Sequence, residues 1–329
     1  MPKILVTGGT GQVGGFVCKE LLDRGHEVIA YDYKPNPQNI AEIASRVKLV
    51  NGDITNFEQL KEIVRSEGVT DIVHLAALLV LESKERPASA IQVNCVGTNN
   101  VFEIARQLNL RRVLYASSVA VYGIPSSYTR KVVNEDDFPR CPVDPYSITK
   151  FLDEWYGKYY GQTYGMDLVC LRITATWGPG RYSGYTGQFN DFVRNVAIGK
   201  PQKYPVDFAY RGSKLNWLYI KDTARIFAHC IEVDKRKIKR TLYNAGSKNP
   251  FKARDVIREI KALLPDSKIQ FNETAEPTEV SLGIAGPSGL QVDCSRLYKE
   301  LGFKEKFALA AAVKDMANLE RSRAGLPPI

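Results

Sequence analysis

A tyrosine and a lysine stand four residues apart in the segment DPYSITKFLDEW, residues 144–155. Asp144 suits the cap of a helix and Pro145 suits its first position, so a helix is predicted to begin here. Tyr146 and Lys150 then lie one turn apart on the same face. Because the chain has 17 tyrosines, such spacing also arises by chance, and its meaning depends on what surrounds it.

A tyrosine beside a lysine ammonium has the chemistry of a base. A free tyrosine hydroxyl ionises near pH 10, so by itself it is a poor base at neutral pH. A neighbouring positive charge favours the phenolate, which can take a proton from a substrate hydroxyl. The alternative is that Tyr146 is simply an aromatic residue at the start of a helix.

The elements that must position this pair follow a regular rhythm. Apolar runs predict strands at 3–7, 26–32, 47–53, 71–77, 111–118 and 166–172, with helical patterns between them, including 57–64 and roughly 87–108. The runs are apolar at nearly every position, which indicates strands buried on both faces of a parallel sheet. Right-handed crossovers then give an α/β fold with a doubly wound, Rossmann-type parallel sheet.

A glycine-rich loop, VTGGTGQVGG, joins the first predicted strand to the first predicted helix. Gly8, Gly11 and Gly14 allow a tight turn, close approach of the backbone to a pyrophosphate, and close helix packing. The helix N-terminus at Gln12 and Val13 offers N–H groups to phosphates. Because the strand–turn–helix context is the required one, we predict a dinucleotide site rather than a flexible turn.

Asp32 ends the second predicted strand, about twenty residues after the glycine loop. An acid at this place accepts hydrogen bonds from the ribose hydroxyls of adenosine. A carboxylate there repels a 2′-phosphate and so favours NAD over NADP, although Lys34 could offset the preference. The alternative is an exposed turn acid before a proline-rich loop.

Further motifs follow in order along the chain. They are the Gly-Asp pair at 52–53, HLAA at 74–77, ASSVAVYG at 116–123, YSITK at 146–150 and WGPG at 177–180. Together with the glycine loop and Asp32, they resemble the extended branch of the short-chain dehydrogenase/reductase family, the NAD-dependent epimerase/dehydratase group. The resemblance covers residues 1 to about 225 in motifs and the remainder in layout.

This resemblance implies roles for individual residues. Tyr146 would be the base while a hydride leaves the same carbon for NAD, Lys150 would also bond the nicotinamide ribose, and Ser118 would hold the substrate oxygen. Otherwise, Ser117 and Ser118 are a strand-end turn. The cofactor residues that the resemblance implies are Asp53 and Ile54 against the adenine, Leu75, Ala76 and Ala77 along the cofactor, and Asn94 nearby. Members of the family often dimerise through two helices per subunit, here those near 87–108 and after Tyr146, so a homodimer is expected.

The substrate side departs from the sugar-nucleotide members of the family. Val119 and Ala120 stand where dehydratases carry an Asp–Glu pair, which disfavours dehydration. Ala175 replaces the asparagine that epimerases place before the WGPG-like segment. Leu215 falls where their diphosphate-gripping arginine stands, seven residues before an aspartate. These losses disfavour a nucleotide diphosphate substrate, although Arg181, Arg211 and Lys214 leave it possible.

The C-terminal half has a looser rhythm and predicts a smaller α/β substrate-binding part. We expect an NAD-binding domain over residues 1–172, with a returning segment near 213–248, and a substrate-binding domain over 173–329. The arrangement from YNAGSKNPF to VDCSRLYKELGF is loosely similar to that of short-chain L-threonine dehydrogenases, although the TAT segment at 174–176 lacks their proline-glycine pair. We take this as support for a small polar substrate.

Composition sets further limits. The 329 residues carry a net charge of +9, but the basic residues are spread out, apart from KRKIKR at 235–240, so nucleic-acid binding is not expected. No secretory signal or membrane-spanning run is evident. Six scattered cysteines and three isolated histidines suggest a cytoplasmic protein without a metal site, and His74 has the setting of a hydrogen-bonded core histidine.

Three functions remain open. The first is an NAD-dependent dehydrogenase or reductase acting on a secondary alcohol or ketone of a small sugar, sugar acid or hydroxy acid. The second is a nucleotide-sugar epimerase with tightly bound NAD. The third is a non-catalytic NAD sensor, which the set of Ser118, Tyr146 and Lys150 argues against.

Overall fold

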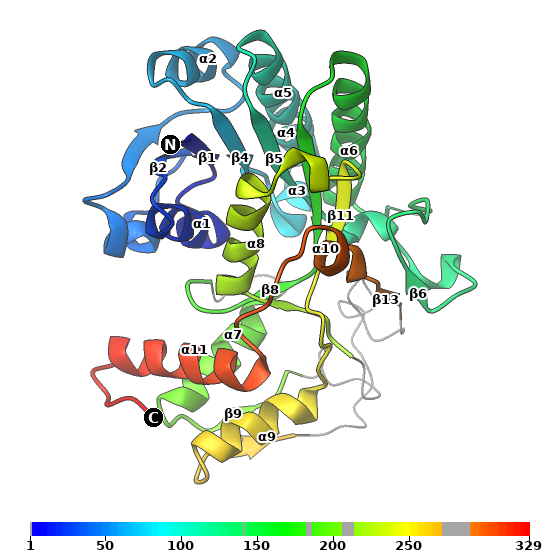
Figure 1. Cartoon of the computed structure of the whole chain (residues 1–329). Helices are drawn as coiled ribbons and strands as arrows, with labels where there is room; N and C mark the ends of the chain where they lie inside the picture. The colour runs from blue at the N-terminus through cyan, green and yellow to red at the C-terminus, as the bar shows by residue number, and fades with distance from the viewer. Residues whose placement is uncertain (1, 141, 182–185, 206–213, 272–289) are drawn as a thin grey trace.

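The centre of the molecule is a seven-stranded, fully parallel sheet (Figure 1). The computed structural model describes residues 2–140, 142–181, 186–205, 214–271 and 290–329. The strands, in their order across the sheet, are β3 (Lys48–Asn51), β2 (Glu27–Asp32), β1 (Lys3–Thr7), β4 (Asp71–His74), β5 (Arg112–Ser118), β7 (Leu168–Ile173) and β11 (Leu242–Ala245). This order reverses between β1 and β4, which is where a doubly wound sheet binds ligands.

Helices cover both faces of the sheet, as the apolar runs predict. On one face, Ile4 and Val6 share a core with α1 (Gln12–Asp23) and α8 (Ile220–Glu232). On the other, Leu5 packs in a core with α2 (Phe57–Ser66), α5 (Gly97–Gln107) and α6 (Pro145–Tyr164). Successive residues of a strand point to opposite faces, so β1 is apolar at consecutive positions. The predicted α/β class is confirmed.

A second, smaller core lies beyond the sheet, in the lower half of Figure 1. Its helices are α7 (Gly187–Ala197), α9 (Ala253–Leu263) and α11 (Leu309–Arg323), and its short strand pairs are β8 (Thr176–Trp177) with β10 (Leu218–Tyr219) and β9 (Gln202–Lys203) with β12 (Ile269–Gln270). Trp177, Phe189, Phe251 and Met316 pack together there. Along the chain, the segments of this smaller core alternate with segments that pack on or join the sheet, namely α8, β11 and α10 (Ser295–Glu300).

Local sequence signals account for the helix that carries Tyr146. The Asp144 carboxylate accepts a hydrogen bond of 2.8 Å from the Ser147 amide, and Ser147 Oγ accepts one from the Asp144 amide, which completes a capping box. Gly165 ends the helix in the left-handed conformation, with φ of 66°. The predicted start of α6 is therefore confirmed.

The helix predicted near 87–108 contains a wide turn in the structure. It runs as α4 (Pro87–Ala90), then a π-helical turn, η2 (Ile91–Val96), and then α5. A preceding short helix, α3 (Val80–Glu85), was not predicted. Inserted π turns occur frequently at functional sites, and this one holds Asn94.

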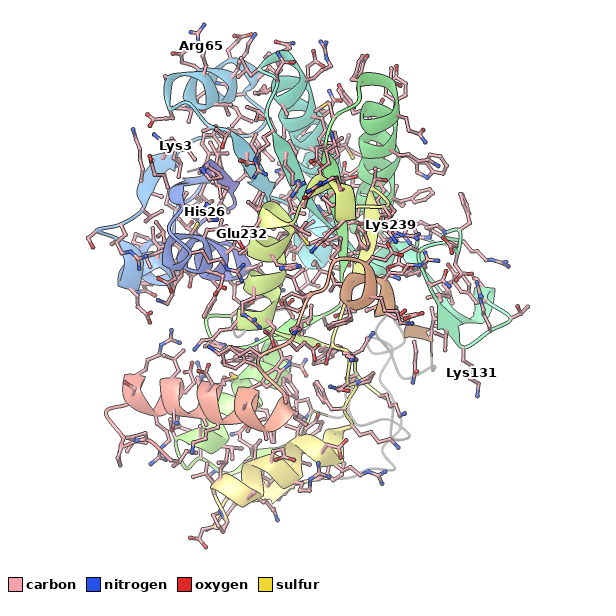
Figure 2. The ribbon with its side chains drawn as sticks, viewed as in Figure 1. Lys3, His26, Arg65, Lys131, Glu232 and Lys239 are labelled. Carbon is pink, nitrogen blue, oxygen red and sulfur yellow. The ribbon has the colours of Figure 1, made fainter. Side chains whose placement is uncertain are left out.

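Charged side chains are distributed over the whole molecule. Lys3, Arg65, Lys131 and Lys239 lie on separate parts of it, whereas His26 and Glu232 lie together beside α1 and α8 (Figure 2), with 2.9 Å between Nε2 and Oε1. None of the described helices is long and apolar enough to cross a membrane. Within the described ranges, no His, Cys, Asp and Glu side chains gather as a metal site would require.

Candidate active site

The glycine loop follows β1 and lies against the backbone that follows β4. Gly8 has φ of 66°, and a Cβ atom there would lie 2.9 Å from the Ala76 amide nitrogen. Only glycine therefore fits this turn without displacing backbone. The loop is as compact as a close approach to a pyrophosphate requires.

The start of α1 is open for an anion. Gly11 caps the helix without any side-chain hydrogen bond, and the first turn carries no acidic residue, so the first N–H groups, which include those of Gln12 and Val13, can serve phosphates. The Gln12 side chain is already engaged, since its amide donates to the Gly178 and Pro179 carbonyls at 3.0 Å each. It joins the glycine loop to the WGPG segment.

Asp32 ends β2 and faces the glycine loop. Its Oδ2 accepts hydrogen bonds from the Thr10 amide (3.1 Å) and the Thr10 hydroxyl (2.7 Å), and its Oδ1 accepts one of 3.2 Å from the Lys34 amide. A carboxylate has about four acceptor positions, so the pair of ribose hydroxyls can still be accommodated. Thr10 fixes the carboxylate, a role that the sequence did not suggest.

The other predicted cofactor residues lie at the ends of β3 and β4. The Asp53 carboxylate accepts a hydrogen bond of 2.8 Å from the Thr55 amide, and Ile54 is buried. After β4, the Leu75 and Ala76 amides donate to the Thr7 hydroxyl at 3.2 and 3.3 Å. The glycine loop, Asp32 and these residues are the ones that could hold NAD. Ala77 continues the segment after β4, and it is partly exposed.

Asn94 is fully buried in the π turn. Its Oδ1 accepts from the Leu78 amide at 2.8 Å, and its Nδ2 donates to the Leu78 carbonyl (3.1 Å) and the Thr149 hydroxyl (3.0 Å). The side chain therefore fixes the segment after β4 against α6 and has no amide hydrogen aimed at open space among these contacts.

The three predicted catalytic residues sit on adjoining elements. Ser118 ends β5, and its Oγ accepts a hydrogen bond of 3.1 Å from the Ala120 amide in η3 (Val119–Tyr122), which packs against α6. Tyr146 is half-buried in the first turn of α6, and the buried Lys150 Nζ lies 5.9 Å from the centre of its ring. The ammonium is thus held below the tyrosine, as the spacing predicts.

A buried ion pair supports this arrangement from behind. Glu154 accepts hydrogen bonds from the Ser117 hydroxyl (2.5 Å) and from Arg172 Nε and Nη2 (2.8 and 2.6 Å). Such a bidentate pair fixes geometry strongly, and Glu154 raises the pKa of Arg172, against the effect of burial. The bond from Ser117 ties the end of β5 to α6, and the sequence reading missed it because its partners are 37 residues apart.

His74 links the glycine loop to α5 through buried hydroxyls. Its Nδ1 lies 2.7 Å from Thr7 Oγ1, and its Nε2 lies 2.9 Å from Thr98 Oγ1. Since Thr98 donates its hydrogen to the Asn94 carbonyl, Nε2 carries the histidine proton and Nδ1 accepts from Thr7. Burial lowers the pKa of His74 to about 3, which confirms the predicted core histidine.

Arg181 acts electrostatically on the tyrosine. In the sequence it was one of three cations that left a nucleotide diphosphate substrate possible. It is half-buried and interacts electrostatically with Glu82 and Tyr146; burial lowers its pKa, and these two residues oppose that effect. Its backbone carbonyl accepts a hydrogen bond of 2.9 Å from Asn190, which ties this segment to α7. A cation therefore interacts electrostatically with the proposed base.

Two departures from the sugar-nucleotide pattern lie at the smaller core, one buried in it and one partly buried against it. Leu215 is 4% exposed and exchanges backbone hydrogen bonds of 2.7 and 3.0 Å with Phe251. Ala175 packs against the same core. Neither side chain can do what the asparagine or the arginine of the sugar-nucleotide members does at that position. Arg211 lies outside the described residues.

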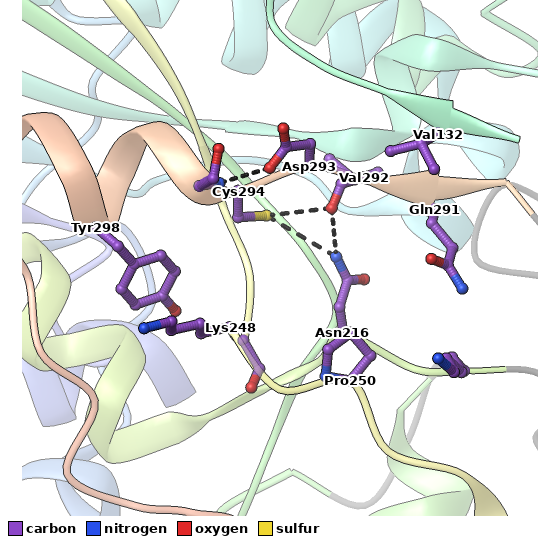
Figure 3. A pocket seen from close by; sticks show the side chains of 12 residues that line it. Val132, Asn216, Lys248, Pro250, Gln291, Val292, Asp293, Cys294 and Tyr298 are labelled. Atoms are coloured by element: carbon purple, nitrogen blue, oxygen red, sulfur yellow. Dashed lines mark hydrogen bonds between the residues drawn. The ribbon is translucent and has the colours of Figure 1, made fainter. Parts of the chain in front are cut away.

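A separate cavity of about 240 Å³ opens between the strand β13 (Gln291–Val292) and the segments at 214–216 and 247–250 (Figure 3). Asn216 lines the cavity, and its side-chain amide donates a hydrogen bond of 3.0 Å to the Val292 carbonyl. The carbonyl of Asn216 accepts from the Thr174 hydroxyl at 3.0 Å, just beyond β7. None of the predicted site residues lines this cavity.

Comparison with known proteins agrees with this geometry. Residues 4–246 match the model of the NAD dependent epimerase/dehydratase family. A mitochondrial L-threonine 3-dehydrogenase of Sus scrofa is 28% identical over 325 residues, which cover 96% of this chain and 82% of the relative. The structure of an L-threonine dehydrogenase from Clostridium difficile superposes with a TM-score of 0.85 at 26% identity, covering 99% of both chains. A UDP-glucose 4-epimerase from Thermus thermophilus, in complex with NAD, is 25% identical with a TM-score of 0.76, covering 97% of this chain and 99% of the other.

Proposed function

The chain belongs to the NAD dependent epimerase/dehydratase family and is an NAD-dependent enzyme, and from this premise we propose that it oxidises a secondary alcohol of a small hydroxy acid. The observation that carries the proposal is the electrostatic interaction of Arg181 with Tyr146, whose ring centre lies 5.9 Å from the buried Lys150 Nζ. An arginine is suited to a carboxylate, which it can bind through two parallel hydrogen bonds.

Each residue of the site has a distinct task in this proposal. Tyr146 takes the proton of the substrate hydroxyl, and the Lys150 ammonium stabilises the resulting phenolate. Ser118 Oγ accepts from a backbone amide, so its own hydrogen is available for the substrate oxygen. NAD would be held by Gly8, Gly11, Gln12, Val13 and Asp32 and would supply the hydride-accepting chemistry.

The smaller core supports a substrate without a nucleotide. The apolar side chains of Leu215 and Ala175 offer no group for a diphosphate, whereas L-threonine, which is named for two of the similar proteins, is a small hydroxy acid with a carboxylate. We therefore place L-threonine first among the compounds to test. A nucleotide-sugar epimerase is the second candidate, because an epimerase is also among the similar structures.

One assay separates these candidates. The purified protein is incubated with NAD and, in parallel, with L-threonine, other hydroxy acids, free sugars, sugar acids and UDP-glucose, and NADH absorbance is followed. We expect net NADH with a hydroxy acid. Isomerised UDP-sugar without net NADH, together with NAD that stays bound through gel filtration, would replace the dehydrogenase by the epimerase.

We also propose that the partner is a second copy of the chain. On α6, Ile148, Leu152, Tyr156 and Tyr159 are 40–54% exposed and recur every three or four residues, which gives an apolar stripe. Ile91 is similarly exposed on the neighbouring helical run, which packs against α6. Two such helices can pair with the same two helices of another subunit about a twofold axis.

We also propose how the chain divides into two domains. Residues 1–172, with the returning segment near 213–248, would hold NAD, and 173–329 would otherwise shape the substrate site. A cytoplasmic location is supported by the free thiols of Cys18, Cys95, Cys170, Cys230 and Cys294.

A further inference from the structure

A buried carboxylate lies directly beneath the proposed catalytic pair. Asp153 is on α6, one turn after Lys150, and both residues are 3% exposed. Its Oδ2 lies 4.0 Å from Lys150 Nζ. Tyr146, Lys150 and Asp153 therefore form a column along one face of the helix, with the charge alternating below the tyrosine.

Apart from Lys150, the groups around the Asp153 carboxylate offer it few hydrogen-bond donors. Thr98 Oγ1 lies 3.4 Å from Asp153 Oδ2, but its single hydrogen is directed to the Asn94 carbonyl. Among the described contacts, Lys150 is thus the main group that stabilises the charged form. Burial raises the pKa of Asp153 to about 7, against the opposing effects of Lys150 and of the long hydrogen bond from Thr98.

The other titratable groups that face this position do not change charge near neutral pH. Burial raises the pKa of Cys95 on η2 to about 12 and that of Tyr115 on β5 well above its ordinary value. His74 on β4 stays neutral, with a pKa lowered to about 3, and Glu154 is paired with Arg172. Of Asp153, Cys95, Tyr115 and His74, Asp153 is therefore the group whose pKa lies near neutrality.

We propose that Asp153 is a positioning residue that holds the Lys150 ammonium in place and, through its own charge, sets how strongly that ammonium acts on the Tyr146 hydroxyl. The inference rests on the proposed function only in assigning Tyr146 as the base. When Asp153 is neutral, the ammonium acts on the phenolate at full strength. When Asp153 is ionised, it offsets part of that field.

The direction of the effect follows from these charges. Replacing Asp153 by a neutral residue removes the negative charge, so Tyr146 should ionise at lower pH. The two charges are separated by two helical turns in a partly buried site. The midpoint of Tyr146 ionisation should therefore fall by about 0.5 to 1 pH unit. A purely structural carboxylate would leave the ionisation of Tyr146 where it is.

The test measures tyrosinate absorbance against pH, without substrate or NAD. Wild type, Asp153→Asn, Asp153→Ser and Asp153→Glu are each compared with the same protein carrying Tyr146→Phe, so that the difference isolates Tyr146. Glu103→Gln, on the neighbouring α5, is the control for loss of a carboxylate from this helix pair. The two neutral variants give the same information if one of them fails to fold.

We expect Asp153→Asn and Asp153→Ser to lower the midpoint of Tyr146 ionisation by about 0.5 to 1 pH unit, and Asp153→Glu and Glu103→Gln to leave it within a few tenths. An unchanged midpoint in the neutral variants overturns the proposal. The pH profile of turnover should shift in the same direction. If Tyr146→Phe keeps its turnover, the proposed function fails, but the absorbance titration still decides the role of Asp153.

Discussion

Gly14 packs so closely on the turn before α1 that a Cβ atom on it would lie 2.0 Å from the Gly8 carbonyl oxygen. The contact is with backbone, which cannot rotate away as a side chain can. The same turn forms the proposed phosphate site. The packing of α1 and the binding of the cofactor therefore both depend on the contact between Gly14 and Gly8.

Gly14→Ala should therefore destabilise the protein by about 1–3 kcal/mol and weaken NAD binding. Gly161→Ala is the matched control, since Gly161 is also helical and its Cβ would lie 3.7 Å from its nearest neighbours. That change should be neutral or stabilise by up to about 1 kcal/mol. Thermal unfolding and a fluorescence titration with NADH measure both effects, and equal behaviour of the two variants contradicts the prediction.

Tyr146→Phe should lower turnover by at least about 100-fold, because the proton acceptor is lost. NAD binding should be little changed, since Tyr146 makes no contact with the glycine loop or Asp32 in the described hydrogen bonds. Steady-state rates on the true substrate, with NADH titration as the control, check this. Near-normal turnover would remove Tyr146 from the role of base.

Arg181→Gln should raise KM by about 10- to 100-fold, because a charge-assisted hydrogen bond contributes about 1.5–3 kcal/mol, while kcat changes less. Lys214→Gln is the control, since Lys214 is an exposed cation that lines the separate cavity. The two variants are compared by their kinetics on a hydroxy acid. If Arg181→Gln leaves KM unchanged, the carboxylate has another partner.

Leu152→Glu should convert the proposed dimer to a monomer, because it places a charge in the centre of the apolar stripe on α6. Leu49 on β3 is exposed to the same degree, 41% against 40%, but it lies at the far edge of the sheet. Leu49→Glu should keep the dimer. Light scattering after gel filtration gives the mass of each variant, and a wild-type monomer would refute the prediction directly.

Acid should destabilise the protein through His74. Its pKa is near 6.5 in the unfolded chain and is lowered to about 3 in the folded one, so its contribution to stability is complete above pH 6.5 and is lost as the pH falls toward 3. Within that window it contributes a slope of up to about 1.4 kcal/mol per pH unit. Urea unfolding at successive pH values should show a shallower slope for His74→Gln than for wild type.

The parts that the sequence predicted well were those encoded by local patterns. The burial of β1 on both faces, the cap of α6 and the glycine turn all follow from neighbouring residues. The pairing of Thr10 with Asp32 and the placement of Asp153 against Thr98 could not be predicted, because they depend on how distant segments pack. Asp153 was visible three residues after Lys150, but only the position of α5 shows that this face of the helix is buried.

The smaller core draws on four stretches of the described chain, and its last members are Ala312, Val313 and Met316. Among the described residues between these stretches, members of α8, β11 and α10 belong to a core of the sheet. During synthesis, strands β1 to β5 and the cofactor loop can therefore form early, whereas the smaller core stays open until residues 312–316 have left the ribosome. A truncated or stalled product would contain the cofactor loop without a complete smaller core. A chimera that exchanges the smaller core with that of a relative would need several splice points.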